Sequence, residues 1–214
     1  SASLDESQAK RELASVGICV PRGDRVDSLE SLEAAARSLT FPLVLKACDS
    51  KLTHKSDAGA VIINISSVSD LVAAAKTLFA WYPELLVEEM VTDAVCELIV
   101  GVSQDPVIGP WIMIGSGGIF AELLADRKVL LLPVQNGGFE QAINSLKINP
   151  LLKGYRGGRP ADISALLDAL QNLSDFALKH TDSLIELEIN PLLVRAEGKG
   201  VCAVDAVLQY ARAS

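Results

Sequence analysis

The chain contains 214 residues, of which 50% are hydrophobic and 21% are charged. This composition excludes an intrinsically disordered chain, and the length is sufficient for one large domain or two small ones. The net charge of −8 argues against nucleic acid as the main partner, because a phosphate backbone requires a basic surface.

The cysteines and the apolar runs of the sequence indicate in which cellular compartment the protein is expected. Four widely spaced cysteines, none of them in a C-x-x-C pair, favour free thiols in a reducing cytoplasm. No apolar run approaches the roughly 20 residues that a membrane-spanning helix needs. No signal-peptide pattern opens the chain. We therefore expect a cytoplasmic protein that does not act on a membrane.

Hydrophobic periodicity in the first half of the chain predicts a mixture of helices and strands. Ser69 is the predicted N-cap of the third helix, because a short polar side chain there can accept a backbone N–H. The predicted helices are residues 5–16, 27–39 and 67–79, and the predicted strands are residues 42–48, 60–65 and 85–90.

The second half continues this mixture. Residues 161–180 follow the i, i+3, i+4, i+7 apolar pattern closely and predict the clearest helix. The polar link "RAEGK" between two apolar runs predicts a hairpin at the end of the chain. The predicted strands are residues 95–102, 111–115, 129–134, 184–194 and 200–207, and a further helix is predicted over residues 138–147. The fold class is mixed α/β, with two α+β lobes over residues 1–90 and 91–214.

Charged residues inside apolar strands are the first candidates for a site. Lys46 interrupts "LVLKAC", so it either reaches solvent from a strand edge or binds an anion such as phosphate. Glu88 and Glu89 are adjacent on a strand and therefore point to opposite faces, and Glu97 follows on the next strand. They either line a cleft or mark solvent-exposed strand ends.

The terminal hairpin offers a set of oxygen donors. A period of two places Glu186, Glu188 and Asn190 on one face of their strand, and Asp205 lies inside the apolar run "AVDAV" of the next. A carboxylate in such a run is costly unless it is paired or bound to a metal. Carboxylate and amide oxygens suit Mg²⁺, whereas a salt-bridged hairpin face is the structural alternative.

The chain lacks the familiar phosphate-binding motifs, including the P-loop pattern and G-x-G-x-x-G. Gly115, Gly117 and Gly118 in "GSGGIF" form a possible phosphate loop, because glycines let backbone N–H groups approach an anion. A turn between two strands explains these glycines equally well.

His54 is one of only two histidines, and it lies between Lys51 and Lys55 in the polar segment "SKLTHKSDAGA". Neutral imidazole is a nucleophile near pH 7, and neighbouring ammonium groups would stabilise a phosphoryl group placed on it. A structural histidine is the alternative. His180, near the end of a predicted helix, is interpreted only as a favourable cation at the negative end of the helix dipole.

These motifs occur in an order that resembles the ATP-grasp domain, or beta subunit, of ADP-forming acyl-CoA synthetases such as acetate–CoA ligase, which are relatives of succinyl-CoA synthetase. The resemblance extends from about residue 5 to residue 210. The matching segments are "VLK", "HKSDAG", "LVEEMV", "ELIVGV", "GSGGIFAELL", "PLLKGYRG", "ADISALL", "ELEINPLLV" and "AVDAV".

The resemblance implies an ATP-grasp fold, with the nucleotide held between two mixed α/β subdomains. It implies that Lys46 contacts the nucleotide phosphates and that His54 is transiently phosphorylated on a swinging loop. The implied adenine-binding and nucleotide-contacting residues are Glu88, Glu89, Met90, Val91 and Glu97, and the implied Mg²⁺ ligands are Asn190 and Asp205, with Glu188 alongside.

The implied activity is that of a ligase that interconverts acyl-CoA, ADP and phosphate with carboxylate, CoA and ATP. The implied cofactors are ATP or ADP and Mg²⁺, with CoA bound by a partner alpha subunit or domain. This chain would then be the nucleotide-handling part of a hetero-oligomer, active only with that CoA-binding partner.

Two positions depart from the family pattern. Ala60 replaces the second glycine after the histidine, and Leu130 replaces an arginine, for which Arg127 or Lys128 would have to substitute. The missing arginine favours one alternative, a degenerate ATP-grasp module with a regulatory or scaffolding role. A carboxylate–amine ligase that needs no phosphohistidine is a further alternative.

Overall fold

The computed structural model describes residues 2–48, 59–118 and 125–211. It divides the chain into two compact units. Unit 1 comprises Ser1–Leu4, Gln8–Val20 and Asp93–Ser214, and unit 2 comprises Asp5–Ser7 and Pro21–Thr92. The structure groups most of the leading segment with the second half of the chain, and not with a lobe over residues 1–90. The reason is that Ala9, Leu13 and Ile18 are buried in the core of unit 1.

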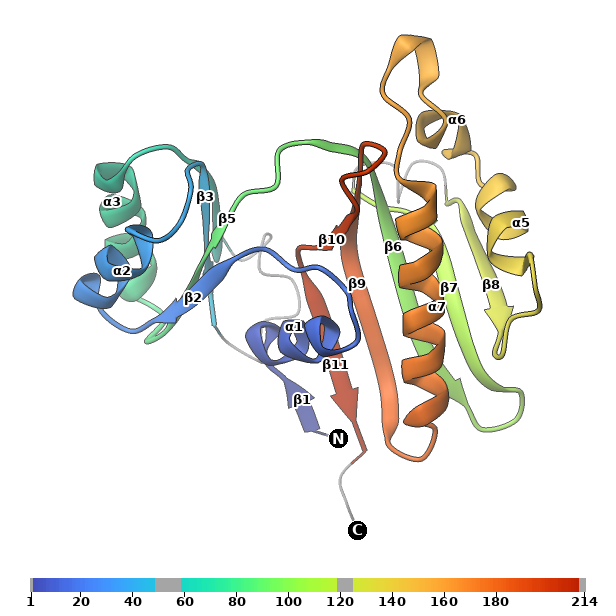
Figure 1. Ribbon diagram of the computed structural model, residues 1–214. Helices are drawn as coiled ribbons and strands as arrows, with labels where there is room; N and C mark the ends of the chain where they lie inside the picture. The colour runs from blue at the N-terminus through green and yellow to red at the C-terminus, as the bar shows by residue number, and fades with distance from the viewer. Residues whose placement is uncertain (1, 49–58, 119–124, 212–214) are drawn as a thin grey trace. The chain divides into compact units, whose positions relative to one another are not determined.

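Unit 2 contains, within the described residues, a four-stranded antiparallel sheet in the order β2-β5-β3-β4. Its helices α2 and α3 pack together on one face of that sheet (Figure 1). The elements are β2 (Gly23–Val26), α2 (Leu29–Ala36), β3 (Leu43–Ala47), β4 (Val61–Ile65), α3 (Val68–Phe79) and β5 (Leu85–Glu89).

Local sequence explains where the two helices of unit 2 begin. Ser28 caps α2 by accepting the N–H of Ser31, whose hydroxyl in turn accepts the N–H of Ser28, a capping box. Ser67 caps α3 by accepting the N–H of Asp70. The prediction of Ser69 as the N-cap of this helix is wrong, because the helix begins at Val68 and Ser69 already lies in its first turn.

Unit 1 contains, in the part of the chain that the structure describes, a seven-stranded antiparallel sheet. The strand order is β1-β11-β9-β6-β7-β8, and β10 pairs with β9 off this path. The strands are β1 (Ala2–Leu4), β6 (Ala94–Asp105), β7 (Gly109–Ser116), β8 (Arg127–Leu131), β9 (Leu184–Arg195), β10 (Val201–Ala203) and β11 (Ala206–Tyr210). The helices are α1 (Glu6–Ser15), α5 (Gly138–Asn144), α6 (Asn149–Leu152), a 3-10 turn at Tyr155–Gly157, and α7 (Ile163–Lys179).

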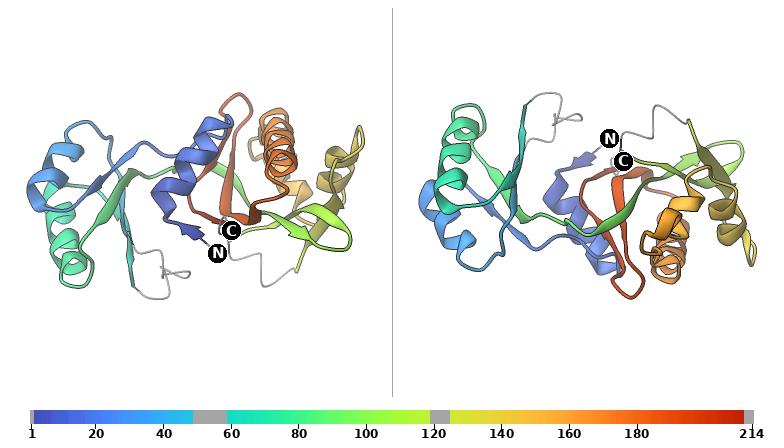
Figure 2. Two further views of the ribbon diagram at one scale, coloured as in Figure 1. Left: turned by 90° about the horizontal axis from the view of Figure 1, so that it is seen from below. Right: turned by 90° about the horizontal axis from the view of Figure 1, so that it is seen from above.

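Helices α1 and α7 cover the same face of the unit 1 sheet (Figure 2). Their apolar residues share one buried cluster with Leu187 and Ile189 of β9. Because side chains alternate along a strand, Glu186 and Glu188 lie on the opposite face. We call this opposite face the Glu188 face, and the strand register adds Gly101 and Arg127 to it.

The predicted terminal hairpin is confirmed, since β9 and β10 pair antiparallel around the "RAEGK" turn. The predicted strand over residues 200–207 is divided, however, into β10 and β11 with an interruption at Val204 and Asp205. Because of this interruption, β10 and β11 pair with different parts of β9. Among the described residues, no helix combines the length and the apolar character that crossing a membrane requires.

Candidate functional site

Lys46 of β3 is buried in unit 2 and lies between two carboxylates. Its Nζ atom is 2.6 Å from Oε1 of Glu6 and 3.2 Å from Oε2 of Glu88. The lysine side chain is 8% exposed and both glutamates are 3% exposed. The alternative that Lys46 reaches solvent from a strand edge is wrong, because β3 lies between β5 and β4. A buried ammonium group requires opposing charge, and the two glutamates supply it.

The two adjacent glutamates of β5 point to opposite faces, as the period of two predicted. Glu88 faces Lys46, whereas the Glu89 carboxylate lies 3.2 Å from Arg22 and accepts the N–H of Thr40 at 2.8 Å. Glu89 therefore ties together the segments that lead into β2 and β3. The interpretation as solvent-exposed strand ends is wrong for Glu88, which is 3% exposed.

The segment after β5 continues with Met90 and Val91, which are both half-buried. The N–H of Met90 donates to the carbonyl of Pro42 at 2.9 Å, so the backbone here is fixed to the start of β3. The strip from Glu88 to Val91 is thus held in one defined conformation in unit 2. Its assignment to adenine stays a prediction.

In unit 1 the structure brings Glu97 of β6 together with the glycines that follow β7. The carbonyl of Glu97 accepts the N–H of Gly117 at 2.8 Å, and the Glu97 side chain covers Gly118, which has a positive φ of 57°. A Cβ atom at Gly115 would lie 2.8 Å from the carbonyl oxygen of Asp126. Close strand packing is therefore one physical reason for these glycines, and phosphate binding by them stays a prediction.

Asp126 is a buried carboxylate that sequence reasoning missed. It accepts hydrogen bonds from the Ser116 hydroxyl at 3.2 Å and from the N–H of Ile148 at 3.3 Å. The N–H of Ser116 also donates to its carbonyl at 2.9 Å. Ser116 and Asp126 thus join the end of β7 to the residue that precedes β8. The only signal in the sequence was an acidic residue shortly before a predicted strand, which is not specific.

Asn190 and Asp205, the predicted metal ligands, are neighbours in unit 1. The N–H of Asn190 donates to the carbonyl of Asp205 at 3.1 Å, at the point where the chain passes from β10 to β11. Asn190 is exposed and Asp205 is half-buried. Glu188 is half-buried two residues earlier on the same face of β9, opposite Val207 of β11.

This donor set fits a hard divalent cation, since it combines two carboxylates and an amide oxygen. The described residues contain no group of three or more His, Cys, Asp or Glu side chains arranged for a metal. An Mg²⁺ site at this place therefore depends on the amide of Asn190 and on oxygens from outside the protein, which suits a cation that retains waters and binds phosphates.

Leu130 of β8, which the resemblance places where the family pattern has an arginine, faces away from these donors. It lies opposite Ile112 and packs against the core beneath the helices. Arg127 of the same strand lies opposite Gly115 on the Glu188 face, whereas Lys128 shares the side of Leu130. Of the two suggested substitutes, only Arg127 is on the face that carries Glu188.

His54 lies outside the described residues, so its predicted role stays a prediction. His180 is the C-cap residue of α7 and its Nδ1 atom lies 2.9 Å from the carbonyl of Phe176. Its ring also stacks at 4.4 Å from that of Phe176. These contacts agree with a structural role at the end of the helix.

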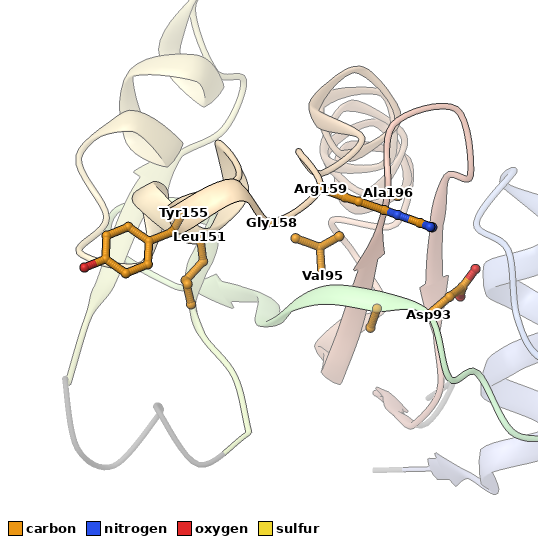
Figure 3. Close-up of a pocket in the computed structure, with 8 residues that line it drawn as sticks. Asp93, Val95, Leu151, Tyr155, Gly158, Arg159 and Ala196 are labelled. Atoms are coloured by element: carbon orange, nitrogen blue, oxygen red, sulfur yellow. The ribbon is translucent and has the colours of Figure 1, made fainter.

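A pocket of about 370 Å³ lies in unit 1, and sequence reasoning did not anticipate it. It combines part of the "PLLKGYRG" motif with the first residues of β6. Figure 3 shows Tyr155 at one end and Arg159 and Asp93 at the other. The lining residues are Asp93, Ala94, Val95, Leu151, Tyr155, Gly158, Arg159 and Ala196.

Comparison with known proteins extends over nearly the whole chain. The chain is 32% identical over 213 residues to the acetate–CoA ligase [ADP-forming] II subunit beta of Pyrococcus furiosus, which covers 95% of this chain and 90% of that protein. It is 31% identical over 217 residues to the trans-feruloyl-CoA synthase FCS1 of an unknown prokaryotic organism. That match covers 98% of this chain but only 31% of the relative, so the chain spans about a third of its length.

A solved structure from Ca. Korarchaeum cryptofilum has the same fold, with a TM-score of 0.85 and 32% identity. The match covers 98% of this chain and 93% of that one. The Korarchaeum protein is a dinucleotide-forming acetyl-coenzyme A synthetase 1 in complex with coenzyme A and Mg-AMPPCP, and its phosphohistidine segment points towards the nucleotide binding site.

The sequence profile of the ATP-grasp domain matches residues 1–209 of this chain. The predicted ATP-grasp fold is therefore confirmed, and so is the resemblance to ADP-forming acyl-CoA synthetases. The chain belongs to the ATP-grasp domain family.

Proposed function

We propose that this chain is the nucleotide-binding part of an ADP-forming acyl-CoA synthetase, in which it transfers a phosphoryl group between His54 and ADP. The observation that carries the proposal is the match to a named beta subunit over 90% of that subunit's length. In the direction of ATP use, a nitrogen of His54 would bond to the γ-phosphorus as the bond to the bridging oxygen breaks, and ADP would leave.

Lys46 would act as the phosphate-binding cation of unit 2. Glu6 and Glu88 hold its ammonium group by contacts of 2.6 and 3.2 Å, so its position is fixed before any nucleotide arrives. A fixed cation stabilises charge on a transferred phosphoryl group without having to reorganise. Glu88 would therefore act indirectly, by positioning the ammonium group of Lys46. The backbone of Glu89, Met90 and Val91 would contact the adenine.

Asn190, Asp205 and Glu188 would hold Mg²⁺ in unit 1. When it is bound, Mg²⁺ neutralises charge on the nucleotide phosphates. Glu97 and the glycines Gly115, Gly117 and Gly118 would approach the same phosphates from the end of β7. The chain itself contributes oxygen donors, backbone N–H groups and the orientation that the strands impose.

The partner of this chain would be a CoA-binding alpha subunit or domain, which forms the acyl phosphate. The longer relative, of which this chain spans 31%, has room for such a part in the same polypeptide. The assembly would be a hetero-oligomer in the cytoplasm, a reducing compartment in keeping with four cysteines that are free thiols in the structure.

The proposal is tested by incubating the chain with Mg²⁺ and ATP and measuring its intact mass. We expect one added acid-labile phosphoryl group in the natural sequence and none in His54→Ala. His180→Gln is the matched control, because it removes the other imidazole from a position that only caps α7. The CoA-binding partner is added in a parallel reaction, since the histidine segment can require that surface.

Each alternative function predicts a different result. A degenerate module would bind Mg-ATP but leave His54 unmodified with and without the partner. A carboxylate–amine ligase would turn over substrate equally well in His54→Ala. Either result would refute the phosphohistidine step and leave only the family assignment.

A further inference from the structure

Cys19 and Cys202 lie side by side in unit 1, although 182 residues separate them in the sequence. The carbonyl of Cys19 accepts the N–H of Ala203, the residue after Cys202, at 2.8 Å. The bonded N–H belongs to the peptide that joins Cys202 to Ala203, so the backbones of Cys19 and Cys202 are in direct contact, as a disulfide between them requires.

The two thiols differ in their exposure to solvent. Cys19 is exposed, in the segment between α1 and Pro21, where the chain passes from unit 1 into unit 2. Cys202 is 2% exposed and lies in the middle of β10. A small oxidant in solution can therefore reach Cys19 directly, and Cys202 is placed to react only with a group formed on Cys19.

Two basic side chains act on the pair. Arg195 of β9 acts electrostatically on both thiols, and Lys10 of α1 acts on Cys202. Asp93 holds the guanidinium group of Arg195 with two contacts of 2.7 Å, so its position is fixed. The hydrogen bond from Cys202, opposed by burial and assisted by Arg195, lowers the pKa of Cys19 to about 6. The same hydrogen bond and burial raise the pKa of Cys202.

We propose that Cys19 and Cys202 are a peroxide-reactive dithiol that forms a reversible disulfide. The Cys19 thiolate attacks one oxygen of hydrogen peroxide, the O–O bond breaks, and the released hydroxide takes up a proton as water. The Cys202 sulfur then attacks the Cys19 sulfenic acid, the S–S bond forms, and the sulfenic oxygen leaves as a second water with the proton of Cys202. Two thiols are oxidised and one peroxide is reduced to two waters.

The position of the pair gives this bond a structural consequence. The chain leaves unit 1 after Val20 and returns to it at Asp93. Arg195 fixes the returning segment through Asp93, and the disulfide would fix the outgoing segment through Cys19. Oxidation would therefore anchor both of these connections to the β9–β10 hairpin. This inference goes beyond the proposed function and does not depend on it.

The test is a count of alkylatable thiols on the full chain. The reduced protein is treated with a small excess of hydrogen peroxide at pH 7, quenched with catalase, unfolded and alkylated. The count should fall from the four free cysteines to two, with an intact mass lower by two hydrogen atoms before alkylation. A peptide map should join Cys19 to Cys202, and dithiothreitol should restore all four thiols.

Three variants make the test decisive. Cys19→Ser should lose no further thiols on oxidation, whereas the control Cys48→Ser should still lose two. In Cys202→Ala, with its fold checked by circular dichroism, Cys19 should stay as a sulfenic acid that dimedone traps. A bond between two chains, a bond that uses Cys48 or Cys96, or over-oxidation of Cys19 with Cys202 still alkylatable would overturn the proposal.

Discussion

Lys46 and Glu6 form a buried ion pair at 2.6 Å between residues that are 40 positions apart in the sequence. The pair joins the start of α1 to β3 within unit 2. Glu6 also lies in the first turn of α1, where a negative charge is favourable because of the helix dipole. The residue that is proposed to bind phosphate is therefore also a residue that holds the fold of unit 2 together.

Glu6→Gln is expected to destabilise the protein. Breaking a buried ion pair costs about 3–5 kcal/mol when one charge is left alone. Glu88 still opposes Lys46 in this variant, so we expect a loss of about 1–3 kcal/mol in the free energy of unfolding. Urea unfolding followed by circular dichroism measures it. The control is Glu33→Gln on the exposed face of α2, which should change stability by less than about 0.5 kcal/mol. An equal change in the free energy of unfolding for the two substitutions would show that the Glu6–Lys46 ion pair does not stabilise the protein.

Asp162→Ala is expected to weaken the start of α7. The Asp162 carboxylate accepts the N–H of Ala165 at 3.1 Å and that of Gly200 at 2.9 Å. Loss of an N-cap costs about 1 kcal/mol. The best control is Asp162→Asn, which retains a capping oxygen and should therefore lose much less stability than Asp162→Ala.

The same residue predicts a pH dependence with a definite sign. The hydrogen bonds from Ala165 and then Gly200 lower the pKa of Asp162 in the folded protein. Its contribution to stability is therefore complete above the unfolded pKa of about 3.9 and is lost as the pH falls through the lower folded value. The stability difference between the natural sequence and Asp162→Ala should shrink below about pH 4. A difference that grows on acidification would refute this assignment.

Asp205→Asn is expected to weaken nucleotide binding in the presence of Mg²⁺. The substitution removes a charged oxygen donor beside Asn190 while preserving its shape. Even residues that only orient a metal ligand typically contribute 10–100-fold to metal affinity, so we expect a loss of about tenfold or more. Calorimetry with ATP, with Mg²⁺ and with a chelator, measures the difference. Glu186→Gln, on the same face of β9 but four residues from Asn190, is the control and should bind normally. A loss that persists with the chelator would argue against a metal ligand.

Leu130→Arg is expected not to increase phosphoryl transfer. The side chain at this position packs against the core, on the face of the sheet opposite to Glu188. The arginine would lose that packing and could keep its charge in water only by extending along the edge strand. We expect an unchanged rate of His54 phosphorylation per folded molecule and a stability loss of about 1–2 kcal/mol. A rate that rises clearly above that of the natural sequence would show that Leu130 limits the activity.

Strongly periodic segments could be predicted from the sequence. Helix α7 was expected over residues 161–180 and spans Ile163–Lys179, because its apolar stripe continues for more than four turns. The alternation of Glu186 and Glu188 with Leu187 predicted which side chains face the core, and their burial confirms it. Short elements were missed. Strand β1 has three residues, and β2 reads "GDRV" with a single buried side chain, so neither carries a period that can be detected.

The candidate site was less predictable, because its contacts are tertiary. Lys46 could be identified as an unusual residue in an apolar strand, but nothing in the sequence pairs it with Glu6. The closeness of Cys19 and Cys202 likewise depends on how the segment after α1 runs beside β10. Asn190 and Asp205 were expected together from the resemblance, and a backbone hydrogen bond now joins them.

Helix α1 begins at Glu6 in unit 2 and continues from Gln8 in unit 1, so neither unit is one continuous stretch of chain. A gene fragment that starts at Asp93 would lack Ala9, Leu13 and Ile18, which are buried in the core of unit 1, and would also lack β1, which pairs with β11. Such a fragment should aggregate unless residues 1–20 are supplied as a second peptide or fused to its end through a linker. Dissection or permutation of this protein therefore has to keep its first helix with its last strands.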